Sequence, residues 1–348
     1  MTPKLTQTIK RVALSPLTTV YALVISIRHK LFDSGVYKSE AGALPTLVLG
    51  NIHAGGTGKT PHASYFLQIL SEKLGGPKKV ALLSRGYKRT SKGFCWVETD
   101  GDWRKYGDEP ALLKTLNSSN PIAVCEDRIS GIKQIKQERP EVMIVILDDG
   151  LQHRKLLPTK SVFILDSDRP LKNDVLLPAG NLRDLKSRLK TADLIVIARS
   201  KQGLKEEVLK QGGSIKEGTP VLTSYMQEKD VESTIEGKPR ILAICGIAEP
   251  ERFMDSLTPK WSVVRRESYS DHYIYSKKDV EGWLASIRNE KLDGIVTTSK
   301  DAVRIKPLIA NRPEIKMHSI CIGVKWNDEE AVQQWIDQWL ETTIFAQQ

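Results

Sequence analysis

The sequence predicts an α/β protein: a mainly parallel sheet flanked by helices, with a second, smaller α/β unit and an amino-terminal helix before them. Three observations lead to this fold class. Short apolar runs alternate with helical stretches from residue 46 onward, as in a parallel α/β sheet. The alternation restarts near residue 240, after a polar stretch. The first 38 residues carry one helical stretch with an apolar stripe.

The composition is that of a globular protein. With 348 residues, 40% of them hydrophobic and 27% charged, the chain is too apolar to be disordered and too polar to be a polytopic membrane protein. Four dispersed cysteines without a C-x-x-C pair favour a reducing, cytoplasmic environment and give no zinc motif. The net charge of +10 favours an anionic partner, such as a nucleotide, a nucleic acid or a phospholipid surface.

The amino-terminal segment, residues 1–38, predicts an amphipathic helix. Ser15 is the expected N-cap and Pro16 the first helical residue, with the helix continuing to about Phe32. The 16 uncharged residues from 12 to 27 fall short of the ~20 that a spanning helix needs. Arg28 and Lys30 follow without a cleavage site, so a secretion signal is not expected.

The charges around this helix suit a membrane surface. Residues 1–38 contain six cations against Asp33 alone, a net +5 and half of the excess of the whole chain. A cationic helix with an apolar stripe can lie in the headgroup region of an anionic bilayer. A helix packed on its own domain is the alternative that the pattern leaves open. The stripe consists of Leu17, Val20, Val24, Ile27 and Leu31.

The two α/β units are expected at residues 39–226 and 240–348, with a polar linker at 227–239. Strands of the first unit are predicted at 46–49, 79–84, 121–125, 142–147, 161–166 and 193–198, and helices at 59–74, 127–138, 185–189 and 204–210. Strands of the second unit are predicted at 240–245, 263–267, 294–298 and 318–323, and helices at 250–257, 277–289 and 329–341.

A glycine-rich turn after the first strand predicts a P-loop, and with it a P-loop NTPase-type sheet. Backbone N–H groups of such a turn face phosphate oxygens, Lys59 can reach the β and γ phosphates, and Thr60 can ligate Mg²⁺. The first glycine of the regular G-x-x-x-x-G-K-[ST] pattern is replaced by His53. The predicted nucleotide-binding residues are His53, Ala54, Gly55, Gly56, Thr57, Gly58, Lys59 and Thr60.

Two acids follow the apolar run at 142–147. Because the carboxyl end of a buried parallel strand faces the ligand crevice, Asp148 and Asp149 are expected near Mg²⁺. A turn carboxylate that caps the next segment is the alternative.

Three further stretches could face the same crevice. Asp108, in Gly107-Asp108-Glu109-Pro110, is either a base for an attacking hydroxyl or a helix N-cap. His272 in the second unit is either structural or part of the site if the two units close on each other. The cationic loop around Arg85 suits a phosphate-bearing ligand or is simply solvated.

Taken together, these motifs resemble the tetraacyldisaccharide 4'-kinases. The resemblance rests on the stretches 50–61, 84–87, 107–110, 148–153, 177–183, 271–272 and 298–303, in this order. The chain departs from the usual pattern at His53-Ala54, Leu151 and Asn181. The resemblance implies transfer of the γ-phosphate of ATP to the 4'-hydroxyl of a tetraacylated glucosamine disaccharide 1-phosphate. It also implies that the protein acts at the cytoplasmic face of the bacterial inner membrane. An interfacial amino-terminal helix would then serve to reach a substrate whose acyl chains stay in the bilayer.

The resemblance also implies roles for single residues. The residue at Asp108 is the family's proposed base, assisted by the histidine at His272, while the carboxylates at 148 and 149 handle Mg²⁺ and Lys59 contacts the phosphates. Contacts to the lipid substrate are predicted for four residues of the shared motifs, namely Arg85, Glu109, His153 and Arg183.

Two rival functions are less compatible with the sequence. A partner-regulated ATPase switch of the deviant Walker type would have a lysine where this chain has Ala54. A nucleic-acid-binding ATPase would need a recognisable nucleic-acid module, whereas much of the excess charge lies in residues 1–38. We therefore expect a membrane-embedded glycolipid and an anionic phospholipid surface as partners, with no nucleic acid and no obligate protein partner.

Overall fold

The computed structural model describes residues 3–99, 101–200, 215–229, 238–257 and 260–345. Its strands are β1 (Glu40–Ala41), β2 (Thr46–Gly50), β3 (Val80–Ser84), β4 (Cys95–Trp96), β5 (Ile122–Val124), β6 (Ile144–Leu147), β7 (Leu156–Leu157), β8 (Lys160–Asp166), β9 (Leu194–Ala198), β10 (Val221–Lys229), β11 (Arg240–Cys245), β12 (Ser262–Ser268), β13 (Gly294–Thr298) and β14 (Met317–Trp326). Its α-helices are α1 (Pro3–Asp33), α2 (Lys59–Lys73), α3 (Trp103–Tyr106), α4 (Asp108–Leu116), α5 (Arg128–Glu138), α7 (Pro250–Leu257), α8 (Lys277–Glu290), α9 (Ser299–Ile309) and α10 (Glu329–Thr343). Short 3-10 helices lie at η1 (Pro77–Lys79), η2 (Leu171–Asn173) and η3 (Lys186–Thr191).

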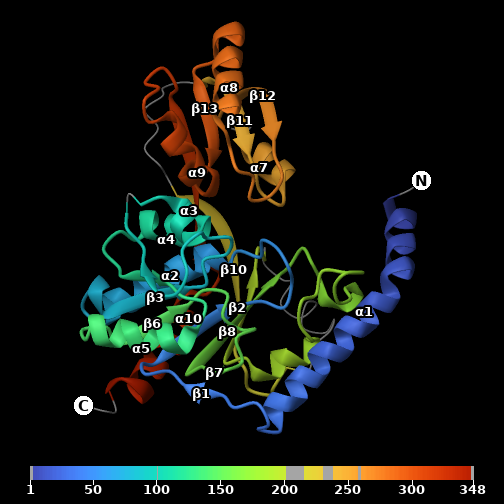
Figure 1. Cartoon of the computed structure of the whole chain (residues 1–348), viewed down its shortest axis with the longest axis vertical. Coiled ribbons are helices and arrows are strands. Elements are labelled where there is room, and N and C mark those ends of the chain that lie inside the picture. Colours follow the sequence, from blue (N-terminus) through green and yellow to red (C-terminus); the bar gives the residue numbers. More distant parts are fainter. Residues whose placement is uncertain (1–2, 100, 201–214, 230–237, 258–259, 346–348) are drawn as a thin grey trace.

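Within these residues, twelve strands form one sheet in the order β12-β11-β13-β14-β10-β9-β8-β2-β6-β3-β5-β4. Neighbouring strands are parallel except at β10–β14 and β4–β5. The antiparallel β10–β14 pair joins two parallel halves, a larger one around β2 and a smaller one around β11 (Figure 1). The predicted fold class, a parallel sheet flanked by helices with a second smaller α/β unit, is confirmed.

The larger half is covered on both faces, as parallel sheets require. Its central strands β2, β3 and β6 are buried throughout. Phe66 and Leu67 of α2 belong to the core on one face, and Ile132 and Ile135 of α5 belong to the core on the other. In the smaller half, Trp283 of α8 lies in one core and Met254 of α7 in the other.

The carboxyl-terminal helix α10 belongs to the larger half. The sequence assigns residues 329–341 to the second unit, but Val332, Ile336 and Trp339 lie in the same buried cluster as Phe66. The chain therefore leaves the first unit along β10 and returns to it after β14 (Figure 1).

Strand β10 also changes the expected linker. It continues to Lys229, so the first residues of the predicted linker 227–239 are paired with β14. Residues 230–237 and the predicted helix at 204–210 lie outside the described residues.

Helix α1 begins earlier than predicted. Pro16 lies inside the helix, not at its first position. A proline cannot donate to the carbonyl four residues back. Here the Ser15 hydroxyl donates to that carbonyl, the one of Val12, at 2.9 Å, which satisfies the acceptor and lets the helix continue.

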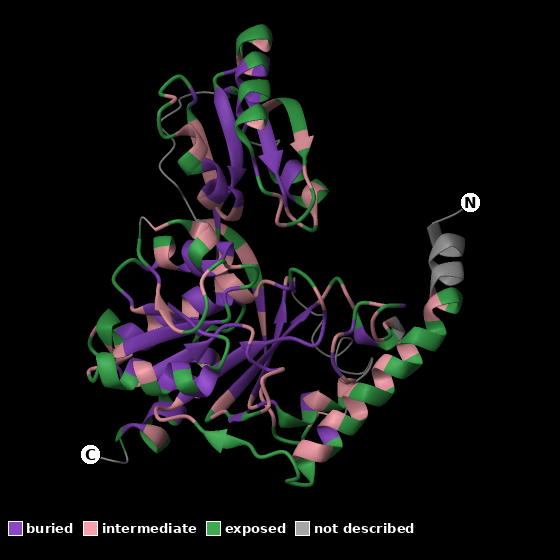
Figure 2. Ribbon diagram, viewed as in Figure 1, coloured by how far each residue is buried: buried purple, intermediate pink, exposed green. Residues whose placement is uncertain are grey.

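The apolar stripe of α1 faces away from the protein. Leu17, Val20 and Val24 are 59%, 60% and 58% exposed, whereas His29 on the opposite side is buried (Figure 2). A 23-residue stretch of α1, residues 11–33, is long and apolar enough by composition to cross a membrane, and little of it is buried against the rest of the protein. The protein-facing side of this helix is thus the more polar one.

Replacing Trp339 by alanine tests the placement of α10. Because Trp339 is 2% exposed in the core of the larger half, we expect the free energy of unfolding to fall by about 3 to 5 kcal/mol. Hydrogen exchange should accelerate in β2, β3 and β6 but not in β11 and β13. Trp283→Ala is the matched control, with the opposite pattern. Faster exchange confined to β11 and β13 in Trp339→Ala would assign α10 to the second unit.

Candidate active site

The glycine-rich turn between β2 and α2 has the backbone of a phosphate-binding loop. Gly55 and Gly58 adopt φ of 92° and 83°, in the left-handed region that favours glycine. Gly58 is the N-cap residue of α2, and a Cβ there would collide with the Met226 side chain of β10. The Asn51 side-chain amide donates to the hydroxyl of the fully buried Thr57. The loop is therefore held rigid ahead of the positive end of α2.

His53, the departure from the regular pattern, turns its imidazole away from the glycines. The ring is fully buried, with Nε2 3.5 Å from Asp174 Oδ2, and burial lowers its pKa. Neither ring nitrogen has a hydrogen-bond partner among the described residues. The structure thus brings the His53 side chain to Asp174, although the sequence analysis places it among the nucleotide-binding residues.

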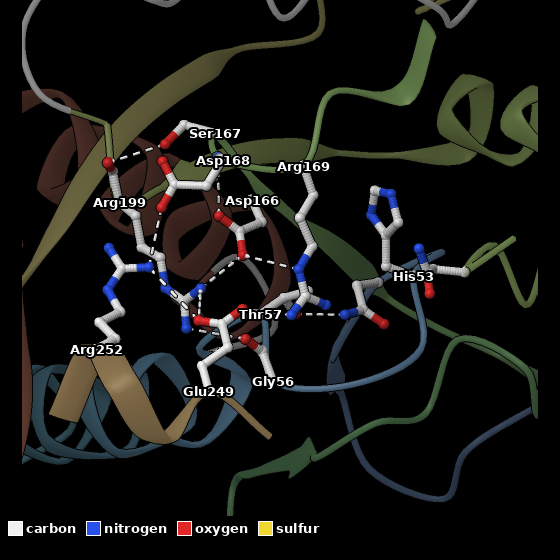
Figure 3. Close-up of polar contacts among 12 residues, drawn as sticks. His53, Gly56, Thr57, Asp166, Ser167, Asp168, Arg169, Arg199, Glu249 and Arg252 are labelled. Atoms are coloured by element: carbon white, nitrogen blue, oxygen red, sulfur yellow. Dashed lines mark hydrogen bonds and ion pairs between the residues drawn. The ribbon is translucent and has the colours of Figure 1, made fainter. Parts of the chain in front are cut away.

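Two arginines support the loop from the neighbouring strands (Figure 3). Arg199, after β9, donates to Gly56 O at 3.0 Å and to Asp166 Oδ2 at 2.7 Å. Arg169, after β8, donates to Ala54 O at 3.4 Å. Both arginines also pair with Glu249, which precedes α7 in the second unit. The loop is therefore tied by ion pairs to the smaller half of the molecule.

Asp148 directly follows the central strand β6, and among the described residues no ion pair holds its carboxylate. Its carboxylate is 2% exposed, and Oδ1 has no hydrogen-bond partner among the described residues. Burial, reinforced by the charges of Glu109 and Asp149, raises the pKa of Asp148. A cation bound beside such a carboxylate would stabilise its ionised form.

Asp149 is already paired. It has a φ of 53°, and Arg183 binds it through both guanidinium nitrogens. Lys59 Nζ lies 3.9 Å from Asp149 Oδ1. Burial acts to raise the pKa of Asp149, but Arg183 and Lys59 outweigh it and the pKa is lowered. Lys59, Asp149 and Arg183, all predicted site residues, are therefore brought together.

Asp148 fits a Mg²⁺ ion of the kind that accompanies nucleotides. The described residues contain no cluster of three or more His, Cys, Asp or Glu side chains that could hold a metal by itself. Mg²⁺ is normally held by one or two carboxylates together with phosphates and water, so a complete protein cage is not needed. The unpartnered Oδ1 of Asp148 supplies the free carboxylate oxygen that such an ion requires.

A buried arginine that the sequence analysis did not select lies near these carboxylates. Arg128 is 3% exposed and donates to Cys125 O and Glu126 O. Burial lowers its pKa, and Asp148 and Asp149 oppose that shift. Arg85, the predicted phosphate contact, is exposed, and its positive charge contributes to the lowered pKa of Arg128. Arg128 follows the N-cap Asp127 as the first residue of α5, and no motif in the sequence singled it out.

The Asp108–His272 pair bridges the two units. Asp108 is the first residue of α4, after the N-cap Gly107, so it is not the N-cap itself. His272 Nδ1 lies 2.8 Å from Asp108 Oδ2 and Tyr87 packs edge-on against its ring. His272 has a φ of 59°, a strained backbone of the kind concentrated at functional sites. Burial acts to raise the pKa of Asp108, but His272, Lys300 and Arg304 outweigh it and lower the pKa.

The structure places the remaining predicted substrate residues, Glu109 and His153, in different surroundings. Glu109 follows Asp108, and its negative charge contributes to the raised pKa of Asp148. His153 lines an open cavity of about 570 Å³ together with Arg28 and Phe32 of α1 and with Arg154. Burial and the charge of Arg128 lower the pKa of His153. A cationic cavity therefore lies between α1 and the carboxyl edge of the sheet.

The chain is similar to known proteins over most of its length. A family model described as tetraacyldisaccharide-1-P 4'-kinase matches residues 10–341. The chain belongs to this family. The tetraacyldisaccharide 4'-kinase of Bacteroides thetaiotaomicron is 32% identical, over 93% of this chain and 91% of the relative, and that of Flavobacterium johnsoniae is 31% identical, over 95% and 98%. A solved structure of "apo" form LpxK from Aquifex aeolicus in complex with ATP has a TM-score of 0.75 and 27% identity, covering 94% of this chain and 99% of that one.

Replacing Asp148 by asparagine should stabilise the ligand-free protein. Because the pKa is raised, folded Asp148 keeps its proton where an unfolded aspartate has lost it, so its cost to stability grows as pH rises. We expect the melting temperature to rise by roughly 2 to 4 °C at pH 8 and by less at pH 5, because the cost accumulates from the unfolded pKa up to the folded pKa of about 7.

Asp149→Asn is the matched control for this measurement. The lowered pKa of Asp149 means that its ionised form stabilises the fold, so its removal should lower the melting temperature at pH 8. Equal destabilisation by both substitutions would show that Asp148 is not an unpaired charge.

Proposed function

We propose that this protein transfers the γ-phosphate of ATP to the 4'-hydroxyl of a tetraacylated glucosamine disaccharide 1-phosphate, with Mg²⁺ as the metal. The observation that carries the proposal is the 2.8 Å contact between His272 and Asp108, in a chain of the tetraacyldisaccharide 4'-kinase family. It unites a base, from the larger half, and an imidazole, from the smaller half, near the acids that follow β6. A regulatory ATPase switch has no use for such a pair.

Asp108 is the base in this proposal. Its lowered pKa keeps it ionised at neutral pH, so it can accept a hydrogen bond from the sugar hydroxyl and take the proton as the phosphate is transferred. His272 orients the carboxylate through its Nδ1 contact. Proton transfer is a modest part of phosphoryl transfer, in which positioning and charge neutralisation dominate.

Lys59, Thr60 and Asp148 handle the charge of the triphosphate. Lys59 would contact the β and γ phosphates, while the Thr60 hydroxyl and the unpartnered Asp148 oxygen would hold Mg²⁺. When bound, Mg²⁺ neutralises the negative charge that develops on the phosphate oxygens. Arg183 fixes Asp149, which in turn lies beside Lys59 and limits its movement.

The lipid substrate is proposed to approach along α1 from the cytoplasmic face of the inner membrane. The exposed stripe of Leu17, Val20 and Val24 fits the acyl region of the bilayer, because no other part of the described chain covers it. The polar side of α1 stays on the protein: Arg28 donates to Gln152 O at 2.8 Å and His29 contacts Asp184 at 2.6 Å. With its polar side held on the protein, α1 is proposed to lie in the interface, although residues 11–33 are long and apolar enough to cross a membrane.

The cationic cavity beside α1 is the proposed place for the substrate headgroup. Arg28, Arg154 and His153 line it, and these side chains suit a sugar phosphate. Beside α1, such a site would let the acyl chains stay in the bilayer while the sugar extends toward Asp108.

Incubation with γ-labelled ATP, Mg²⁺ and the disaccharide lipid in detergent micelles tests the reaction. We expect label on the lipid with the intact protein and none with Lys59→Ala. Asp108→Ala and His272→Ala should each lower kcat by about 10² to 10⁴-fold while ATP binding persists. Turnover near wild type in both variants would refute the base assignment.

Sedimentation with anionic vesicles tests the role of α1. Val20→Asp combined with Val24→Asp should weaken binding at least about tenfold, because two charges would enter the apolar boundary region. Val264→Asp, at an exposed valine of β12, is the matched control and should leave binding unchanged. Retention on DNA at equal salt, without vesicle binding, would instead favour a nucleic-acid partner.

A further inference from the structure

The segment that begins α9 has no role in the reaction described so far, although it lies against α4. Thr298 caps α9 by accepting from the Asp301 N–H at 3.1 Å. Lys300 lies in the first turn of this helix, where a cation opposes the helix dipole. The placement of Lys300 therefore does not serve the stability of α9.

Arg304, one turn further along α9, keeps Asp108 in place. It is 2% exposed and donates to Gly246 O at 3.1 Å and to Asp301, which Tyr275 and Thr298 also bind. Its Nη1, without a hydrogen-bond partner among the described residues, lies 3.7 Å from Asp108 Oδ2. The carboxylate therefore has a fixed cation behind it.

Lys300 contacts the far side of the His272 ring. Its Nζ lies 3.3 Å from His272 Nε2 and 3.3 Å from Asp271 Oδ1, and Glu109 Oε1 is 4.0 Å away. An ammonium group can only donate, so the neutral imidazole must accept at Nε2. Its proton then lies on Nδ1, which faces Asp108 Oδ2. The contact is compatible with one tautomer of neutral His272.

We propose that Lys300 is a positioning residue for phosphate transfer, which fixes His272 in the Nδ1-protonated tautomer that donates to Asp108. The inference rests on the proposed role of Asp108 as the base. With the other tautomer, a lone pair of His272 would face the carboxylate, and Asp108 would lose the hydrogen bond that orients it. Lys300, like His272, comes from the smaller half, so both act on Asp108 only when that half is docked.

Kinetics of Lys300 variants test this role. Lys300→Met should lower kcat about tenfold or more while the KM for ATP changes less than about twofold, because the ATP-binding residues are untouched. Lys300→Arg, which keeps a donor, should restore most of kcat. Lys306→Met is the matched control, an exposed lysine in the last turn of the same helix, and should behave as wild type. Unchanged kcat in Lys300→Met overturns the proposal.

Nitrogen-15 spectra of labelled histidine give a readout that a purely structural role would not move. We expect one His272 tautomer, with Nδ1 protonated, in wild type and in Lys306→Met, and a mixture of both tautomers in Lys300→Met. A single unchanged tautomer in Lys300→Met would overturn the inference even if its activity fell.

A double-mutant cycle separates the two proposals. If Lys300 acts through His272, Lys300→Met should cause no further loss in a His272→Ala background. An equal loss in both backgrounds would overturn the role of Lys300 and leave the base assignment intact. Wild-type turnover in His272→Ala alone would instead overturn the role of the Asp108–His272 pair.

Discussion

The antiparallel pairing of β10 with β14 is the constraint on which the rest of the structure depends. It joins the two parallel halves into one sheet, and β10 also runs along the phosphate loop. His62 of α2 links the two: its Nδ1 donates to Gly58 O at 2.7 Å, and its Nε2 accepts from the Ser224 hydroxyl of β10 at 2.9 Å. Complete burial lowers the pKa of His62 to about 4, so this link stays neutral at physiological pH.

The sequence predicted the elements whose pattern is local. Strands β2, β6, β8 and β9 were found because a strand buried on both faces is an almost unbroken apolar run. Strand β10 escaped because its sequence, VLTSYMQEK, turns polar where it leaves the larger half. Helix α9 escaped because it begins directly after β13 and contains Pro307. The start of α1 was misplaced because Ser15 replaces the hydrogen bond that Pro16 cannot make.

For the site residues, too, predictability depended on whether the sequence pattern around each residue is local. Lys59, Asp148 and Asp149 were predictable because each stands close behind an apolar strand. Lys59 begins the helix that follows β2 and the glycine-rich turn, and the two aspartates directly follow β6. Asp108 and His272 are 164 residues apart, and their individual motifs left both a structural and a chemical reading open. Single charged residues such as Arg128, Arg199 and Glu249 carry no local pattern at all. Only the topology, which brings loops of both halves to one edge of the sheet, gives them a common place.

Helix α1 contacts the same loop that fixes Asp149, so the position of the helix is coupled to that of the site. The Tyr21 hydroxyl donates to Arg183 O at 3.1 Å, His29 binds the neighbouring Asp184, and the Arg183 side chain grips Asp149. The exposed stripe of α1 and the carboxylate of Asp149 are thus connected through a short series of direct contacts. If α1 lies at the bilayer surface as proposed, this connection fixes the distance between the phosphate loop and the lipid headgroups, so that only a hydroxyl at that height above the acyl chains could reach the phosphate.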